Sequence, residues 1–597
     1  MSIKERLEHL REEMKKANID AYIIPTSDFH ESEYVGEYFK ARNFISGFTG
    51  SAGIVVVTME EAGLWTDGRY FIQAAKELEG TGITLFKMGE PGVPTMDEYL
   101  YDLVPDGGVL GFDGRVMCAK RGMELGQKVI DKGVKISYKD DLVDLIWTKR
   151  PSLSKELAFI LDTKYCGKSF TEKVQELRQT MKEKGATIHI LTTLDDIAWL
   201  FNLRGGDIAF NPVVLAYAII TLDETILFVD ESKLSEEIKT QFVADGIQIK
   251  AYEDIYQEVT QFNKEEVVLL DSNKVNYTIY NSLPEGIKKL DEINPTIYKK
   301  AKKNEVELEN IRRSHIKDGV AFTKFMYWLK TNIGKIEITE LSASEKLEEF
   351  RREQEGFIEP SFKTIAAYKE HGAMMHYSAS KESNYVLEQE GLFLIDSGGQ
   401  YYDGTTDITR TLALGEISEE LKKHFTAVVR GMINLSKARF LEGVKGYNLD
   451  ILARGPIWDL GIDYKCGTGH GVGFLLNVHE APNGFRWKIV PERNDSCVLE
   501  EGMVTTNEPG IYIEGSHGIR IENELVTRKS ISNEHGQFLE FETITFAPID
   551  LDGIDVEEMN KSERIYLNAY HEQVYTKISP FLTEEEREWL KVYTRAI

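Results

Sequence analysis

The chain of 597 residues carries 71 Lys plus Arg against 98 Asp plus Glu, a formal net charge of −27 at pH 7. This excess of negative charge argues against nucleic acid or an anionic membrane surface as the main partner. Hydrophobic residues make up 42% and charged residues 28% of the chain, as in ordinary soluble globular proteins. The length predicts about three to five domains.

The N-terminal segment and the cysteines predict a cytoplasmic protein. The first residues show helical spacing of apolar side chains among charges, without a signal-peptide core. The longest wholly apolar run, residues 213–220, is too short to span a bilayer. Four scattered cysteines form no C-x-x-C pair, so neither a disulfide framework nor a thiolate zinc site is expected.

Two α/β segments are predicted before the third part of the chain. Residues 1–152 begin with an amphipathic helix and alternate helical and strand patterns, with strands expected at 21–24 and 54–57. Residues 153–308 follow a break near Pro151. The first elements of this part are predicted to be a helix at 171–184, a strand at 188–191 and a short helix at 194–200. Asp195 and Asp196 are expected to cap the short helix.

The third part, residues 309–597, carries the candidate chemistry. A long helical pattern, from 305 to about 332, leads into it. Further along, the apolar run 392–395 predicts a buried strand that ends in Asp396. An unpaired buried carboxylate would cost several kcal/mol, so a partner or a metal is expected. Asp407 is the first candidate, because a glycine-rich loop between the two aspartates would let them face each other across a hairpin.

Four further elements stand out in this part. His376 follows a Met-Met pair, and His470 lies between glycines that allow a close backbone approach. Glu508 precedes a proline that holds it extended. Glu522 follows Arg520 by two residues, so strand alternation would place both on one face and let the arginine keep the glutamate ionised.

Each of these residues alone has an ordinary explanation, such as a core histidine or a surface ion pair. Together, four carboxylates and one imidazole supply a charge of −4 against the +4 of two divalent ions bridged by water or hydroxide. No H-E-x-x-H motif supports a single-zinc protease helix, since His479-Glu480 is followed by Ala-Pro-Asn.

The residues in this order resemble a known family. The aspartates are spaced by eleven residues and the glutamates by fourteen, in the order Asp396, Asp407, His470, Glu508, Glu522. This pattern resembles the dinuclear pita-bread metallopeptidases, and among them the long three-domain Xaa-Pro aminopeptidases, also called aminopeptidases P. Segments 65–70 and 195–205 and the C-terminal tail share the resemblance. It implies two creatinase-type α/β domains followed by a pita-bread α+β catalytic domain with a C-terminal extension.

The resemblance implies roles for the ligands. Asp396 would chelate one ion, Asp407 and Glu522 would bridge both, and His470 with Glu508 would complete the coordination of the second ion. A hydroxide between the ions would attack the scissile carbonyl, because bound metal lowers the pKa of water. Manganese is the expected metal, with zinc or cobalt as alternatives.

The resemblance also assigns residues around the substrate. Glu508 would help move the proton, while His376 and His479 would hydrogen-bond the substrate and stabilise the oxyanion. Tyr512 and Arg520 would orient the carboxylates. A pocket flanked by His376 and His479, with apolar neighbours such as Phe474 and Leu475, could accept a proline ring. The sequence departs from the family at Cys466, where a histidine is common, and packing is the favoured role for that thiol.

The expected activity is release of the N-terminal residue from peptides with proline in second position, by a cytoplasmic homodimer in which Arg69 contributes to the approach to the site. Prolidase, which takes only dipeptides, is the main alternative. A peptide-binding relative without catalysis is a second one. The complete set of five ligands argues against it.

Overall fold

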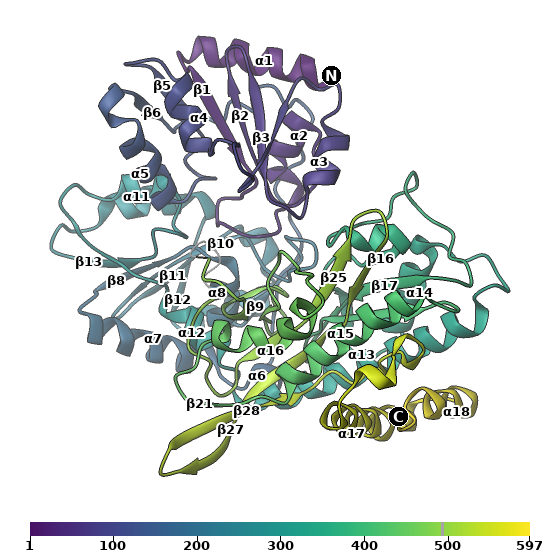
Figure 1. The fold of residues 1–597 in the computed structure, drawn as a ribbon. Coiled ribbons are helices and arrows are strands. Elements are labelled where there is room, and N and C mark those ends of the chain that lie inside the picture. The colour runs from purple at the N-terminus through teal and green to yellow at the C-terminus, as the bar shows by residue number, and fades with distance from the viewer. Residues whose placement is uncertain (491–494) are drawn as a thin grey trace. The chain divides into compact units, whose positions relative to one another are not determined.

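The computed structural model describes residues 1–490 and 495–597, which form two compact units. The first unit consists of Met1–Leu161 and Lys168–Thr296, and the second of Asp162–Gly167 and Ile297–Ile597 (Figure 1). In the described part of the chain, no helix is both long and apolar enough to cross a membrane.

The first unit begins with a six-stranded sheet in the order β4-β3-β2-β1-β5-β6. β1 pairs antiparallel with β2 and parallel with β5. Along β1, Ile24 packs into one apolar cluster and Ile23 into another, because successive strand side chains point to opposite faces. The elements of this part are β1 Ala21–Pro25, β2 Ile54–Thr58, β3 Ala62–Thr66, β4 Thr84–Lys87, β5 Val109–Phe112, β6 Lys135–Ser137, α1 Ile3–Lys16, α2 Ala41–Ser46, α3 Phe71–Glu77, α4 Met96–Leu103 and α5 Ala119–Lys128.

The second sheet of this unit repeats the topology of the first. Its order is β12-β11-β10-β8-β13-β14, with β8 antiparallel to β10 and parallel to β13, as β1 is to β2 and β5. The elements are α7 Phe170–Lys184, β8 Ile188–Leu191, α8 Leu194–Phe201, β10 Ala216–Thr221, β11 Thr225–Val229, α9 Glu236–Ala244, β12 Ile247–Lys250, α10 Ile255–Glu258, β13 Val267–Leu270, α11 Tyr277–Ser282 and β14 Lys288–Asp291, with a small sheet of β7 Phe159–Ile160 and β9 Leu203–Arg204.

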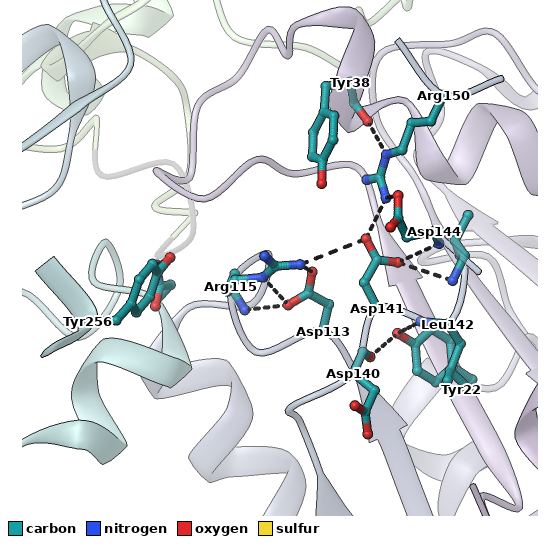
Figure 2. A network of polar contacts seen from close by, with 12 residues as sticks. Tyr22, Tyr38, Asp113, Arg115, Asp140, Asp141, Leu142, Asp144, Arg150 and Tyr256 are labelled. Atoms are coloured by element: carbon teal, nitrogen blue, oxygen red, sulfur yellow. Dashed lines mark hydrogen bonds and ion pairs between the residues drawn. The ribbon is translucent and has the colours of Figure 1, made fainter. Parts of the chain in front are cut away.

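A polar network holds the segment that ends the first α/β part (Figure 2). The Arg150 guanidinium lies 2.6 Å from Asp141 Oδ2 and donates to the Tyr38 carbonyl at 2.9 Å. Arg115 pairs with Asp113 at 3.0 Å and reaches Asp141 at 4.0 Å. These partly buried ion pairs fix the chain just before Pro151, where the sequence predicts a break.

Among the described residues, the second unit contains four sheets, one of six strands, two of three strands and one of two strands. The sheet orders are β15-β18-β19, β16-β17-β20, β21-β28-β27-β24-β22-β23 and β25-β26. The strands are β15 Phe357–Pro360, β16 Ile365–Tyr368, β17 Leu392–Ser397, β18 Gly399–Tyr401, β19 Gly404–Thr405, β20 Ile408–Ala413, β21 Arg439–Leu441, β22 Gly469–Gly471, β23 Glu480–Phe485, β24 Val504–Asn507, β25 Gly510–Ile513, β26 His517–Arg520, β27 Asn523–Asn533 and β28 Gly536–Thr543.

The helices of this unit include the long one predicted from the sequence. α13 Glu305–Asn332 starts at Asn304, whose side-chain oxygen accepts from the N–H groups of Val306 and Glu307 at 3.0 Å each. The other helices are α6 Thr163–Cys166, α14 Glu340–Arg352, α15 Glu419–Ser436, α16 Gly446–Trp458, α17 Lys561–Ile578 and α18 Glu584–Tyr593, and α12 Pro295–Ala301 leads into the unit.

Two sequence predictions need correction. Thr193, not Asp195 or Asp196, is the N-cap of α8, and the two aspartates lie in its first turn, where their charge favours the helix dipole. The loop between Asp396 and Asp407 is not a simple hairpin turn. It contains β18 and β19, which pair with each other, and β18 also pairs with β15.

We predict opposite effects for two helical glycines, Gly431 in α15 and Gly126 in α5. A Cβ at Gly431 would lie 2.3 Å from the Ala453 carbonyl oxygen, whereas one at Gly126 would make an ordinary contact, 3.6 Å from Ile136 Cγ1. Gly431→Ala should destabilise the protein by roughly 1–3 kcal/mol through overpacking. Gly126→Ala should stabilise it by up to about 1 kcal/mol through backbone entropy. Thermal unfolding of both variants tests this, and shifts in the same direction would contradict it.

Candidate active site

The second unit brings four carboxylates and one imidazole together. Asp407, His470 and Glu522 each offer a ligand atom, and these atoms lie within 4.8 Å of one another. His470 Nε2 lies 3.5 Å from Asp407 Oδ2 and 3.4 Å from Glu508 Oε1. Asp396 joins them electrostatically, since its charge acts on both Asp407 and Glu522.

Neighbouring strands deliver these side chains to one place. Asp396 lies on β17 opposite Thr409 of β20, and the Glu522 N–H donates to the Thr409 carbonyl at 3.1 Å. The Glu508 N–H donates to the Thr468 carbonyl at 2.8 Å, beside β22. A Cβ at Gly469 would lie 1.9 Å from a backbone oxygen of Thr506 in β24, so only glycine permits this approach.

The cluster holds more negative charge than its protein neighbours compensate. Asp407 and Glu522 are 4% and 1% exposed. Burial, and then the charge of Asp396, raises the pKa of Asp407 well above its usual value. Burial, and then the charge of Asp407, does the same to the pKa of Glu522. Among the described residues, one buried oxygen of each has no hydrogen-bond partner, and neither has Asp396 Oδ1.

The side-chain atoms of this cluster are suitable ligands for divalent cations. Unpartnered carboxylate oxygens and a single imidazole are ligands that manganese, zinc and cobalt accept. His470 Nδ1 lies 2.9 Å from the Gly471 carbonyl oxygen. A hydrogen on Nδ1 would donate to that oxygen and leave the Nε2 lone pair facing Asp407 and Glu508. Hydroxyl groups hold the other carboxylate oxygens: Thr409 donates to Glu522 Oε2 at 2.7 Å, and Thr506 donates to Glu508 Oε1 at 3.1 Å.

Arg520 pairs with a different carboxylate from the one predicted. Its Nη2 lies 2.5 Å from Asp396 Oδ2, and its Nη1 donates to the Tyr512 hydroxyl at 2.7 Å. The predicted pairing with Glu522 is wrong because β26 ends at Arg520, so strand alternation does not extend to Glu522. Arg520 and Tyr512 therefore hold Asp396.

Sequence reasoning missed a second pair of supporting residues. The Asp407 N–H donates to Glu524 Oε1 at 2.7 Å, and His315 Nε2 lies 3.1 Å from the same oxygen. Burial lowers the pKa of His315, but the adjacent Glu524 carboxylate outweighs it, so the net shift is upward. Glu524 could have been found as a further carboxylate two residues after Glu522, directly before the apolar pair Leu525-Val526.

The remaining candidates lie as follows. The His479 ring is perpendicular to that of His470, with centroids 4.3 Å apart. His376 lies in the loop before β17, half-buried, next to Met375. Cys466 is half-buried as well, and burial raises the pKa of its thiol to about 11. Arg69 belongs to the other unit, where it forms two hydrogen bonds with Asp67 at 2.8 and 2.7 Å.

A buried ion cluster follows His479 directly. The Glu480 carboxylate, 5% exposed, lies 2.9 Å from the Lys300 ammonium and also pairs with Lys303. Lys303 donates to the Lys300 carbonyl at 3.2 Å. The cluster ties the start of β23 to the segment that precedes α13. It fixes the backbone beside His479.

Comparisons with known proteins agree with this architecture. Two models of the creatinase/prolidase N-terminal domain match residues 6–144 and 149–307. The model of metallopeptidase family M24 matches residues 309–529, and that of the C-terminal region of peptidase M24 matches 537–597. The expected fold, two creatinase-type domains and a pita-bread catalytic domain, is thus confirmed.

The relatives that match the whole length of the chain are named for one activity. The chain is 38% identical to the "Probable Xaa-Pro aminopeptidase P" of Paracoccidioides brasiliensis (strain Pb03), with 99% of both chains covered. It is 40% identical to the protein of that name from Talaromyces marneffei, with 99% of this chain and 92% of the relative covered. A crystal structure of X-prolyl aminopeptidase from Caenorhabditis elegans, described as a cytosolic enzyme with a di-nuclear active site, superposes with a TM-score of 0.95 at 34% identity over 100% of both chains.

The fold and the site thus define a metallopeptidase of family M24. Within that class, the full-length identities show that the chain belongs to the Xaa-Pro aminopeptidase P family. The resemblance drawn from the ligand spacing is confirmed.

Proposed function

We propose that this protein releases the N-terminal residue from peptides with proline in second position, using two divalent ions. The observation that carries the proposal is the buried carboxylate cluster around His470, whose unpartnered oxygens need cations. Family membership over the whole chain supports the reaction and disfavours prolidase and a non-catalytic binder. The cytosolic description of the Caenorhabditis elegans relative supports a cytoplasmic location.

The side chains of the cluster have different proposed roles. Asp396, Asp407, Glu522, His470 and Glu508 would hold the ions, with Asp407 and Glu522 between them. The bound ions would supply Lewis-acid activation of water and of the scissile carbonyl. Glu508, less buried than the other carboxylates at 21% side-chain exposure, is placed to accept and pass on a proton.

Substrate contacts fall to the two histidines. His479, perpendicular to His470, and His376 on its loop would donate hydrogen bonds to the substrate carbonyl and to the developing oxyanion. Phe474 and Leu475 do not serve as the surface for the proline ring, because they are 2% and 0% exposed. Cys466 is assigned a packing role beside Tyr512, and Arg69 a role in the approach of substrate.

Proline specificity follows from shape and hydrogen bonding. Proline has a fixed φ and no amide donor, so a site without an acceptor for that N–H selects it. We expect Arg-Pro-Pro peptides to be cleaved at least about a hundredfold better than Arg-Ala-Pro, roughly 2.7 kcal/mol in the transition state. An acetylated N-terminus should block cleavage. Equal rates on both peptides would refute the assignment, and activity confined to dipeptides would indicate prolidase.

We expect about two metal ions per active chain, most simply manganese, because carboxylate oxygens with one imidazole suit it. Elemental analysis and chelator treatment measure this. Asp407→Ala and Glu522→Ala should each lose at least one ion and abolish turnover, whereas Glu500→Gln, a change on the surface, should alter neither. Full activity in a metal-free preparation would end the metal assignment. Wild-type metal content in both alanine variants would end the bridging assignment.

A homodimer is the last part of the proposal and rests on the family resemblance. Light scattering of active protein at micromolar concentration should give twice the chain mass of 68.0 kDa. A fully active species with the mass of one chain would contradict this expectation.

A further inference from the structure

His376 lies on a loop that needs external support. After β16, a short 3-10 helix, η6 Lys369–Ala373, leads into residues 374–391, which contain no further helix or strand before β17. A residue that contacts substrate must be held within a fraction of an ångström, and loop backbone alone does not do this. The hydrogen bonds that hold this loop therefore decide where His376 lies.

One buried carboxylate forms hydrogen bonds with several residues in and before the loop. Glu340, at the start of α14, is fully buried. Its Oε1 accepts from the Tyr368 N–H at 2.8 Å and lies 2.8 Å from His371 Nδ1, which must carry a hydrogen because a carboxylate only accepts. Its Oε2 accepts from the Tyr385 N–H at 2.9 Å. The Tyr377 hydroxyl, which has one hydrogen to donate, lies 2.9 Å from this oxygen and 2.7 Å from the Ser383 carbonyl oxygen.

These four partners lie before the loop and at two places within it. Tyr368 ends β16, His371 belongs to η6, Tyr377 is the neighbour of His376, and Tyr385 lies in the second half of the loop. The rings also stack: His371 lies 3.8 Å from Tyr385 and 4.3 Å from Tyr377, measured between centroids. Glu340 thus binds the segment that enters the loop, the residue next to His376 and a residue of the second half.

The other side of the loop is held by the metal-site scaffold. The Met375 carbonyl, on the other neighbour of His376, accepts from Arg520 Nη2 at 3.4 Å. A Cβ at Gly518 of β26 would lie 1.7 Å from the Gly372 carbonyl oxygen, so the loop backbone lies directly against that strand. His376 is therefore flanked by one residue bound to Arg520 and one bound to Glu340.

We propose that Glu340 is a positioning residue that fixes His376 against the substrate. The proposal rests on the function proposed above. A carboxylate suits this role because it offers two oxygens to four donors, and its place in the first turn of α14 stabilises the negative charge. Glutamine keeps the shape but turns one oxygen into an NH2 group, which would face a backbone N–H that it cannot bind.

The first test is Glu340→Gln in the full-length, metal-loaded protein. We expect kcat/KM for Arg-Pro-Pro to fall about tenfold, as a displacement of well under 1 Å would produce, with unchanged metal content by elemental analysis. Glu370→Gln is the matched control, because that exposed carboxylate accepts from the Tyr385 hydroxyl at 3.0 Å on the same loop. The control should stay within about twofold of wild type. An unchanged rate in Glu340→Gln would overturn the proposal.

A double-mutant cycle separates positioning from general damage. If Glu340 acts through His376, Glu340→Gln should slow His376→Ala little further. Independent effects that multiply would overturn the proposal. Should Glu340→Gln fail to fold, Tyr377→Phe, which removes one hydroxyl from Glu340, takes its place in the same cycle. If wild-type protein does not cleave Arg-Pro-Pro, the proposed function fails. If it does and the cycle is additive, only the role of Glu340 fails.

Discussion

The second unit depends on the repulsion among buried carboxylates that share one small space. Asp396, Asp407, Glu508 and Glu522 converge on His470, yet among the described residues Arg520 is the only fixed cation that pairs with them. Burial strengthens the repulsion, because the protein interior screens charge poorly. Such an arrangement is unfavourable unless protons or bound cations neutralise it. Metal ions bound there, as we propose, would therefore stabilise the strands that hold these side chains.

Two successive layers of residues hold this cluster in place. Thr409, Thr506 and Glu524 bind the ligand residues directly, and His315 binds Glu524 in turn. Arg520 binds two parts of the site at once. It donates to Asp396 and also to the Met375 carbonyl, on the loop that carries His376. Asp396 and the loop that carries His376 are thereby coupled through one guanidinium.

Much of the fold was predictable because local patterns there agree with the tertiary structure. The sequence predicts the helix at 305–332 and the strand at 188–191 where the structure has them, because a helical pattern and an apolar run mark these segments. The ligands stood out because carboxylates at the ends of apolar strands demand an explanation. Arg520 was paired wrongly because alternation was extended past the end of β26. Glu340 could not be found, because nothing near it in sequence signals the four partners that folding brings to it.

The repeated strand order of the first unit indicates how this unit evolved. The sheets built on β1 and on β8 share the same connections and the same parallel and antiparallel pairings, although their sequences differ. Duplication of one ancestral segment, followed by divergence, accounts for two such copies in tandem. Backbone topology has then outlasted sequence similarity, because many side-chain combinations satisfy one pattern of buried strands. Each copy was free to acquire different surface residues while its scaffold stayed intact.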